Sequence, residues 1–294
     1  METTETISAT CPICGAQTAS AGSKTGLRTG KAFSLRRCPE CGFTFVEQPW
    51  VDYKTIYDEA YYRGEGSDPL VDYAFEYEHP GLTVRNYEWR GVENIVRELS
   101  PAPGKWLDYG CGNGGLVRHA LKSGQYEVFG YDTGAWAEKS RDGGLPVLRE
   151  SELAEHEGTF DIITMIEVIE HVTAPLDFFC ECRRWLKPGG WLFLTTGNAA
   201  SAPKDFLSWP YVSPEIHVSY FTPKALSLAL KQAGFEPRHM KRFSGWNDIV
   251  RFKVLKNLKC RKRNILERMI PWTIVSPMVD ARYKVSAFPI AQAV

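Results

Sequence analysis

A turn that holds four closely spaced glycines restricts the fold of this chain more than any other part of its sequence. It follows an apolar run that ends in a carboxylate, Lys105-Trp-Leu-Asp108, and precedes a helix-like segment from about Leu116 to Lys122. Three of the glycines, Gly110, Gly112 and Gly114, alternate with other residues. Glycine suits a tight turn and a close approach of the backbone to a ligand. The stretch therefore predicts a strand, a ligand-binding turn and a helix in succession.

The alternation of strand and helix continues along the chain. A helix is expected over 82–99, further strands are expected over 126–132, 145–148, 160–166, 191–195 and 283–291, and a helix before 186 connects two of them. Strands that alternate with helices form a parallel sheet with right-handed crossovers. Ligands of such sheets bind at the carboxyl ends of the strands. The sequence therefore predicts an α/β fold with its site at that edge.

Two carboxylates indicate which ligand the glycine turn accepts. The spacing of Gly110, Gly112 and Gly115 fits a dinucleotide-binding turn, and an NAD(P)-dependent oxidoreductase is one reading of it. Asp108, however, ends the first strand, where a carboxylate repels a pyrophosphate and attracts a cation. Asp132 ends the second strand, where a carboxylate can accept both hydroxyls of a ribose. An adenosine with a positively charged amino-acid tail, S-adenosylmethionine (SAM), satisfies both positions.

Several motifs in this order resemble those of class I SAM-dependent methyltransferases. They are Leu107-Asp-Tyr-Gly-Cys-Gly-Asn-Gly114, Gly130-Tyr-Asp132, the segment from Phe160 to His171, the segment from Leu186 to Leu194, and the region from His217 to Phe235. The resemblance covers roughly Val84 to Ser244. It implies a Rossmann-like α/β fold with a mostly parallel, seven-stranded sheet.

The resemblance also implies roles for single residues in holding SAM. Asp108 would orient the methionine amino group, and Gly110, Gly112 and Gly114 would let the backbone approach the methionine. Asp132 would hold the ribose, Ser151 or Glu152 would flank the adenine, and Glu167 would face the methionine or the acceptor.

Two cysteine pairs near the N-terminus predict a metal site. Cys11-Pro-Ile-Cys14-Gly and Cys38-Pro-Glu-Cys41-Gly each place two thiolates on one side of a tight loop. Two such loops supply the four ligands of a tetrahedral, structural Zn²⁺ site, which leaves no position open for catalysis. Two redox-active pairs are the alternative. We expect a small zinc ribbon over residues 1–47, followed by a linker and an aromatic-rich helical cap over 48–81 and the SAM-binding domain over 82–294.

A general base for methyl transfer is expected among the histidines, because the pKa of imidazole lies near neutral pH. His171 follows the fourth strand and His217 precedes an aromatic pair, so both lie where active-site loops are expected. A purely structural role is the alternative for each. Tyr61 and Tyr62 in the cap could close over the acceptor.

The four-cysteine module suggests the kind of acceptor. Together with the SAM motifs, it resembles methyltransferases encoded with sugar and surface-polysaccharide biosynthesis. The expected acceptor is a small molecule, a sugar or a nucleotide- or lipid-linked saccharide. The sequence does not distinguish oxygen, nitrogen and carbon as the methylated atom, and it indicates no oligomeric state.

Charge and hydropathy limit the remaining classes. Lys and Arg number 35, as do Asp and Glu, so the formal net charge is zero and nucleic acid is an unlikely partner. An RNA methyltransferase or a zinc-ribbon binding factor stays as the alternative function. No apolar run is long enough for a transmembrane helix, and the polar start does not resemble a signal peptide. We therefore expect a cytoplasmic protein.

One basic segment adds a partner to these expectations. Residues 251–264 hold seven basic residues and no acidic one, interleaved with apolar residues, within an insertion over about 246–280. This pattern predicts a basic amphipathic helix that packs on the sheet or contacts an anionic acceptor or the inner membrane surface.

Overall fold

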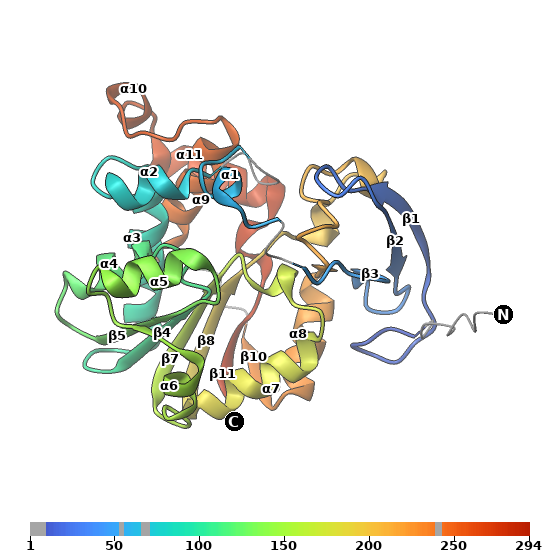
Figure 1. The fold of residues 1–294 in the computed structure, drawn as a ribbon, viewed down its shortest axis with the longest axis horizontal. Helices are drawn as coiled ribbons and strands as arrows, with labels where there is room; N and C mark the ends of the chain where they lie inside the picture. The colour runs from blue at the N-terminus through green and yellow to red at the C-terminus, as the bar shows by residue number, and fades with distance from the viewer. Residues whose placement is uncertain (1–9, 53–55, 66–70, 239–242) are drawn as a thin grey trace.

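The computed structural model of the chain describes residues 10–52, 56–65, 71–238 and 243–294. A seven-stranded sheet with the order β10-β11-β8-β7-β4-β5-β6 forms its centre (Figure 1). The strands are β4 (Lys105–Tyr109), β5 (Glu127–Tyr131), β6 (Val147–Leu148), β7 (Phe160–Ile166), β8 (Leu186–Thr195), β10 (Phe235–Arg238) and β11 (Ile290–Ala293). β4 to β8 pair in parallel, whereas β11 is antiparallel to both of its neighbours. The prediction of a mostly parallel, seven-stranded α/β sheet is confirmed.

Helices cover both faces of this sheet. They are α3 (Arg85–Leu99), α4 (Gly115–Leu121), α5 (Ala135–Asp142), α6 (Glu150–Ala154), α7 (Pro175–Trp185), α8 (Pro223–Gln232), α9 (Trp246–Asn257), α10 (Ile265–Arg268) and α11 (Trp272–Tyr283). One hydrophobic cluster joins α7 and α8 to the sheet, and a second joins α3, α4 and α9 to its other face. α3 shows why these segments are helical: Val92, Ile95, Val96 and Leu99 recur on one face and are all buried.

A smaller antiparallel sheet forms a second lobe (Figure 1). It contains β1 (Ala19–Thr25), β2 (Ala32–Arg37), β3 (Thr44–Val46) and β9 (Ser219–Tyr220). Thr44 pairs with Tyr220 across the last two strands. β9 lies far along the chain, so the N-terminal sheet is completed by a strand outside residues 1–47. The Thr222 hydroxyl, which donates to the Cys41 carbonyl at 2.7 Å, strengthens this junction.

Two short helices form a cap beside the glycine turn. α1 (Glu59–Tyr62) and α2 (Tyr73–Glu78) begin at Asp58 and Asp72, whose side chains accept hydrogen bonds from backbone amides of the first turn. Asn113 in the glycine turn donates to the Tyr73 carbonyl at 2.9 Å, which ties α2 to the carboxyl edge of the sheet. None of the helices in the described ranges has the length and apolar character needed to cross a bilayer.

The sequence predicted one basic helix over 251–264, and the structure differs from this prediction. α9 ends at Asn257, and Lys259 follows in the left-handed conformation with φ 56°. The Lys259 amide donates to the Lys256 carbonyl and the Cys260 amide to the Leu255 carbonyl, both at 2.9 Å. These two bonds form a Schellman motif, which ends the helix and turns the chain.

The last strand also begins later than predicted. It covers 290–293 instead of 283–291, because α11 extends to Tyr283. Lys284 then ends that helix with φ 52°, and a short 3₁₀ turn over Val285–Ala287 precedes the strand. The apolar residues from 283 to 289 thus belong to a helix end and a turn, whose local pattern is similar to that of a strand.

Candidate functional site

The glycine turn after β4 has the geometry of a ligand cradle. Gly110, Gly112 and Gly114 have φ values of 76°, 53° and 69°, a region that other residues rarely adopt. A Cβ atom at Gly110 would lie 2.3 Å from Cγ2 of Val168, so the turn packs tightly against the loop after β7. A Cβ atom at Gly112 would meet no atom within 4 Å. The backbone at Gly112 is therefore open to an incoming group.

Asp108 lies at the buried end of β4. Its Oδ1 accepts a hydrogen bond from the Thr164 hydroxyl of β7 at 2.8 Å, and the residue is 4% exposed. Burial raises the pKa of Asp108 to about 7; the Thr164 bond opposes this shift and the negative charge of Asp132 adds to it. A cation bound beside this carboxylate would favour its ionised form.

Asp132 follows β5 and faces the same turn. Its two carboxylate oxygens accept from the amides of Gly112 at 2.9 Å and Gly134 at 2.7 Å. Tyr62 of the cap lies close by: burial and the charge of Asp132 together raise the pKa of its hydroxyl to about 12. The two predicted cofactor carboxylates and the three glycines therefore meet at one edge of the sheet.

Ser151 and Glu152 lie on α6, after the third parallel strand. Ser151 is exposed, and Glu152 accepts from the backbone amide of Arg149 at 2.6 Å. The Glu152 carboxylate thus caps the first turn of its own helix, a role that needs no ligand.

Glu167 is held in a strained conformation at the end of β7. Its φ of 57° is rare for a residue with a side chain, and such strain clusters at functional sites. Oε1 accepts from Lys253 Nζ at 2.7 Å and from the Thr195 hydroxyl at 2.9 Å. Burial raises the pKa of Glu167, but the positive charges of Lys253 and Lys256 outweigh burial and lower it well below its usual range.

Glu170 lies one turn further and is completely buried. Its carboxylate accepts from the Tyr211 hydroxyl at 2.6 Å and from the Thr196 hydroxyl at 2.8 Å. Burial and the negative charge of Glu167 raise its pKa to about 8. Tyr211 also accepts from the Gly197 amide at 2.8 Å, so it joins the loops after β7 and β8.

The two predicted bases, His171 and His217, lie side by side although 46 positions separate them. Their ring centroids are 5.0 Å apart. Nδ1 of His171 lies 2.8 Å from the Ile216 carbonyl, and Nδ1 of His217 lies 2.7 Å from the Tyr211 carbonyl. A carbonyl only accepts, so each Nδ1 carries a hydrogen, and in the neutral ring Nε2 carries the lone pair. Both rings are thereby held in the tautomer that a base requires.

One aromatic side chain just before α1, Tyr57, contacts His171. The Tyr57 hydroxyl lies 3.1 Å from Nδ1 of His171, and the Tyr57 ring packs edge-on against Tyr61 with centroids 4.7 Å apart. Tyr61 also packs against Tyr62 and Tyr73. The cap therefore connects the histidines to the turn around Asp132.

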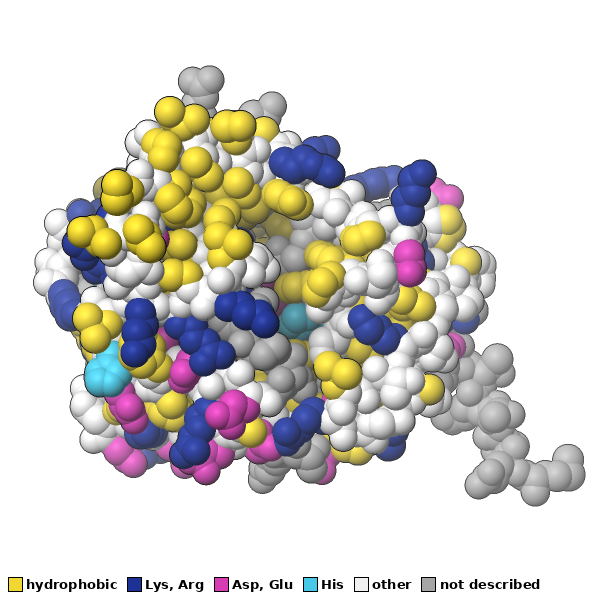
Figure 2. All heavy atoms as spheres, turned by 90° about the horizontal axis from the view of Figure 1, so that it is seen from above, with side chains coloured by type: hydrophobic (Ala, Val, Ile, Leu, Met, Phe, Trp, Pro, Cys, Tyr) yellow, Lys and Arg dark blue, Asp and Glu magenta, His cyan; other side chains and the backbone are white. Residues whose placement is uncertain are grey.

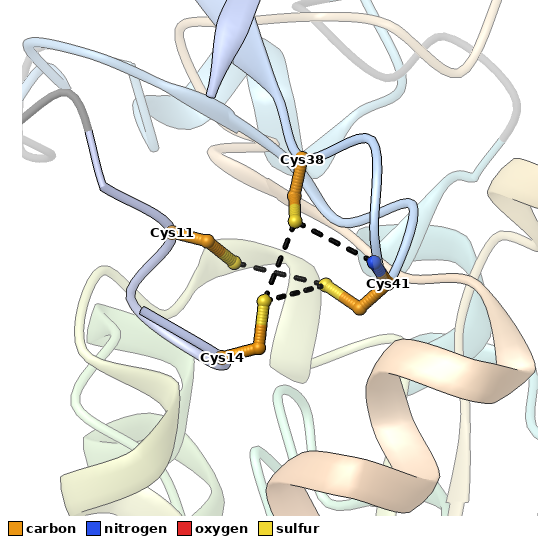
Figure 3. A group of neighbouring side chains, drawn as sticks. All are labelled: Cys11, Cys14, Cys38 and Cys41. Atoms are coloured by element: carbon orange, nitrogen blue, oxygen red, sulfur yellow. Dashed lines mark hydrogen bonds between the residues drawn. The ribbon is translucent and has the colours of Figure 1, made fainter. Parts of the chain in front are cut away.

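The four N-terminal cysteines form a second site, with one pair before β1 and the other between β2 and β3 (Figure 3). Sulfur–sulfur distances are 3.7 Å for Cys11 and Cys41, 3.4 Å for Cys14 and Cys38, and 3.8 Å for Cys14 and Cys41. Four sulfurs at about 2.3 Å from a tetrahedral Zn²⁺ lie about 3.8 Å apart. The glycine after each second cysteine has a positive φ and lets each loop fold back. This donor set therefore fits Zn²⁺.

Sequence reasoning did not assign a site role to Lys253, Tyr211 or Glu170. Glu170 precedes a predicted base and was recognisable as part of the same motif. Tyr211 lies in an irregular segment without periodicity, and Lys253 lies in the insertion. Their contacts depend on the tertiary fold, which a local pattern does not record.

Comparison with known proteins gives the following matches. The sequence profile of a family described as a methyltransferase domain matches residues 84–240, just over half of the chain. The ubiquinone biosynthesis O-methyltransferase of Bordetella avium is 34% identical over 158 residues, which are 46% of this chain and 63% of that protein. The ubiquinone biosynthesis O-methyltransferase of Thiobacillus denitrificans is 31% identical over 165 residues, which are 49% of this chain and 70% of that protein.

Among solved structures, a SAM-dependent methyltransferase from Mesorhizobium loti superposes with a TM-score of 0.45 at 19% identity, over 60% of this chain and 98% of that one. The match to the Bordetella protein spans less than two thirds of its length.

Proposed function

Because this chain belongs to the methyltransferase-domain family, we propose that it moves a methyl group from SAM to a hydroxyl group of a small-molecule acceptor. The observation that carries the proposal is that the loop holding His171 packs against the glycine turn. Val168 of that loop closes on Gly110, and His217 lies beside His171. A cofactor cradle and two candidate bases therefore share one edge of the sheet.

The residues of the cradle fit SAM in charge and in shape. Asp108 supplies a buried carboxylate for the amino group, and the open face of Gly112 admits the methionine. Asp132 supplies two oxygens that can accept hydrogen bonds from the ribose hydroxyls. These bonds would form in addition to, or in place of, those from the Gly112 and Gly134 amides. Gly110 and Gly114 are proposed to shape the turn. Glu167 is proposed to face the methionine or the acceptor, and Ser151 or Glu152 to flank the adenine.

The chain's own residues align the acceptor and receive its proton. When bound, SAM supplies a methyl group that its sulfonium already activates. Nε2 of His217 carries a lone pair and is the proposed acceptor of the hydroxyl proton, since Nδ1 is committed to the Tyr211 carbonyl. His171, in contact with the Tyr57 hydroxyl and beside His217, would help to orient the acceptor. General bases of this kind contribute about 10²- to 10⁴-fold in rate.

We propose a saccharide, free or linked to a nucleotide or lipid, as the acceptor. The rings of Tyr57 beside His171 and Tyr211 beside His217 offer flat apolar surfaces on which a sugar face can pack. A phenolic hydroxyl is the second candidate. The similarity to ubiquinone biosynthesis O-methyltransferases supports this candidate.

The cysteine cluster is proposed to hold a structural Zn²⁺. Four thiolates complete the coordination of the metal, so the site would stabilise the N-terminal loops without taking part in methyl transfer. β3 pairs with β9, which lies two residues after His217. The metal would therefore support the segment that carries the proposed base.

The decisive experiment uses methyl-labelled SAM, the purified zinc-loaded protein, and a host extract separated into nucleotide sugars, lipids, RNA and protein. Label in the sugar or lipid-linked fraction, lost in His217→Ala while SAM binding persists, supports the proposal. His79→Ala changes an exposed histidine and is the matched control. Label in quinone precursors would select the second acceptor, and label in RNA would overturn the small-molecule proposal. Binding of NADH in preference to SAM would overturn the cofactor.

A further inference from the structure

A group of large aliphatic side chains projects outward from the insertion after β10. Its members, between 61% and 76% exposed, are Leu258, Ile265, Leu266, Met269, Ile274 and Met278. We call this group the α10–α11 patch. Figure 2 looks down on this end of the molecule and shows hydrophobic side chains gathered in one broad area, with Lys and Arg side chains along its border. Contiguous apolar surface of this kind marks a contact site.

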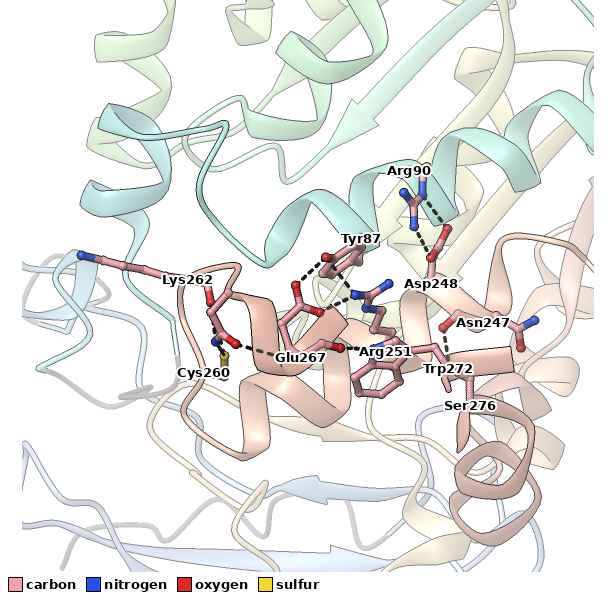
Figure 4. A network of polar contacts seen from close by, with 11 residues as sticks. Tyr87, Arg90, Asn247, Asp248, Arg251, Cys260, Lys262, Glu267, Trp272 and Ser276 are labelled. Atoms are coloured by element: carbon pink, nitrogen blue, oxygen red, sulfur yellow. Dashed lines mark hydrogen bonds and ion pairs between the residues drawn. The ribbon is translucent and has the colours of Figure 1, made fainter. Parts of the chain in front are cut away.

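The patch sits on a firmly anchored base, so its exposure does not come from a loose chain end. Trp272 and Ser276 on the opposite face of α11 are buried, with Nε1 of Trp272 donating to the Glu267 carbonyl at 2.7 Å. The Glu267 carboxylate pairs with Arg251 of α9 and accepts from the Tyr87 hydroxyl of α3 at 2.7 Å (Figure 4). The polar network therefore lies inside, and the aliphatic side chains point out.

The sequence around the patch is strongly basic. Residues 256–284 contain eight Lys or Arg and two Asp or Glu, an excess of six positive charges in a chain whose total is zero. One of the acidic residues, Glu267, is buried in its pair with Arg251. Lys259, Lys262, Arg268, Arg282 and Lys284 are exposed. An apolar centre with a cationic border complements a surface that has an anionic outer layer over an apolar interior.

We propose that the α10–α11 patch docks this protein on the surface of an anionic phospholipid bilayer. The aliphatic side chains would enter the boundary between headgroups and acyl chains, while the Lys and Arg side chains would reach the phosphates. Each basic side chain near such a surface adds to the attraction, and apolar burial adds the rest. α10 and α11 lie on the surface in this arrangement and do not span the bilayer.

A second copy of the chain fits this patch less well. In a two-fold dimer the same surface meets itself, so the cationic border of one copy would face that of the other. Like charges placed opposite each other oppose such an interface. Anionic lipid meets the same border with the opposite charge, and this complementarity selects lipid as the occupant.

The patch is connected to the methyl-transfer site through short contacts. Arg261, between α9 and α10, pairs with Asp72 at the start of α2, and Lys262 stacks on Phe75 of the same helix. Lys253 of α9 reaches Glu167 at the end of β7. Docking would therefore hold the cap and the site entrance near the membrane. The further step, that the acceptor is the lipid-borne form of the saccharide or phenol, rests on the proposed function.

The test is co-sedimentation of the full-length, zinc-loaded protein with vesicles, in low and in physiological salt. Vesicles of phosphatidylcholine alone are compared with vesicles that contain one third phosphatidylglycerol. We expect at least tenfold stronger binding to the anionic vesicles, weakened by salt. Ile274→Ser/Met278→Ser should reduce this binding at least tenfold, whereas Leu27→Ser/Val51→Ser, which changes two apolar residues elsewhere that are even more exposed, should not.

A second pair of variants tests the charges. Lys259→Gln/Arg268→Gln should weaken binding to anionic vesicles severalfold, whereas Lys122→Gln/Lys231→Gln, which removes two exposed charges elsewhere, should leave it unchanged. The proposal would be overturned if the two charge variants lost binding equally, or if the protein bound neutral and anionic vesicles equally. It would also be overturned if the protein bound no vesicles and formed a dimer that Ile274→Ser/Met278→Ser dissociates. SAM binding in solution is measured for every variant, so that failure of docking is distinguished from failure of the methyltransferase function.

Discussion

Nζ of Lys253 lies 2.7 Å from Oε1 of Glu167, and this ion pair joins the insertion helix α9 to the end of β7. Both side chains are 22% exposed, and Glu167 has the strained φ of 57°. The negative charge of Glu167 in turn raises the pKa of Lys253, although burial opposes that shift. The insertion therefore contributes a positive charge to the candidate site, and its outer surface carries the α10–α11 patch.

Replacement of Lys253 should show how much the ion pair with Glu167 contributes to stability. Lys253→Met leaves the Glu167 carboxylate in a largely buried place without its cation, which should cost about 2–3 kcal/mol of unfolding free energy. The measurement is urea unfolding of Lys253→Met, Glu167→Gln and the double variant. A double variant less destabilised than the sum of the single ones is expected. Strict additivity of the two changes would contradict a direct ion pair.

The two histidines should differ in their effect on rate. His217→Ala is expected to lower kcat about 10²- to 10⁴-fold, because it removes the proposed base, with little change in the Kd for SAM. His171→Ala is expected to act mainly on acceptor KM, since the ring contacts the Tyr57 hydroxyl of the cap. Single-turnover rates and SAM titrations of both variants measure this. Equal kcat losses in both would contradict the assignment of one base.

SAM binding should strengthen as pH rises through neutrality. The pKa of Asp108 is raised to about 7, so at pH 6 most of this carboxyl is neutral and cannot attract the cofactor's ammonium group. Below pH 7 the Kd should fall by up to about tenfold per unit of rising pH and then level off. Isothermal titration from pH 5.5 to 8.5 measures this. Asp108→Asn should bind weakly at every pH, and a pH dependence that survives in this variant would assign the effect to another group.

Glu170 should make the fold less stable at high pH. The pKa of Glu170 is about 8 in the folded chain, whereas an unfolded Glu titrates near 4.3. Between these values the folded state retains a proton that the unfolded state has lost, so the free energy of unfolding falls as pH rises. The slope is at most about 1.4 kcal/mol per pH unit for one group.

Glu170→Gln resembles the protonated carboxyl and should remove this contribution. Its stability relative to the natural chain should therefore increase from pH 6 to pH 8, as measured by unfolding at several pH values. Glu138→Gln, which changes an exposed carboxylate, should show no such trend. An unchanged slope in Glu170→Gln would show that Glu170 is ionised in the folded protein near neutral pH.

The parts of this molecule that local patterns encode were predictable from the sequence. The strand before Asp108, the glycine turn and the helix after it depend on neighbouring residues, and the structure has them within about two positions of those expected. The helix end at Asn257 was missed, because Lys259 adopts a positive φ without being glycine. Nothing in the residue type at that position indicates the turn.

Contacts between distant segments were not predictable in this way. β9 completes the N-terminal sheet from 173 positions beyond β3, and Lys253 reaches Glu167 across 86 positions. Such pairs form only when the sheet has brought the segments together, and neither partner carries a periodic signal of the other. His171 and His217 were each expected in an active-site loop, His171 because it follows the fourth strand and His217 because it precedes an aromatic pair, but their contact with each other had no signal in the sequence.

Loss of zinc should disable the site from a distance. The loop of Cys38 and Cys41 continues into β3, β3 pairs with β9, and Thr222 after β9 donates to the Cys41 carbonyl. Cys14→Ser removes one of four thiolates, so bound zinc should fall from about one equivalent to near zero. The segment with His217 should then lose its support, and methyl transfer should fall about tenfold or more while SAM binding persists.

Metal analysis, SAM titration and activity are measured together. Cys180→Ser, which changes an exposed cysteine outside the cluster, should keep both zinc and activity. Full activity of a zinc-free Cys14→Ser protein would show that the ribbon and the site are independent.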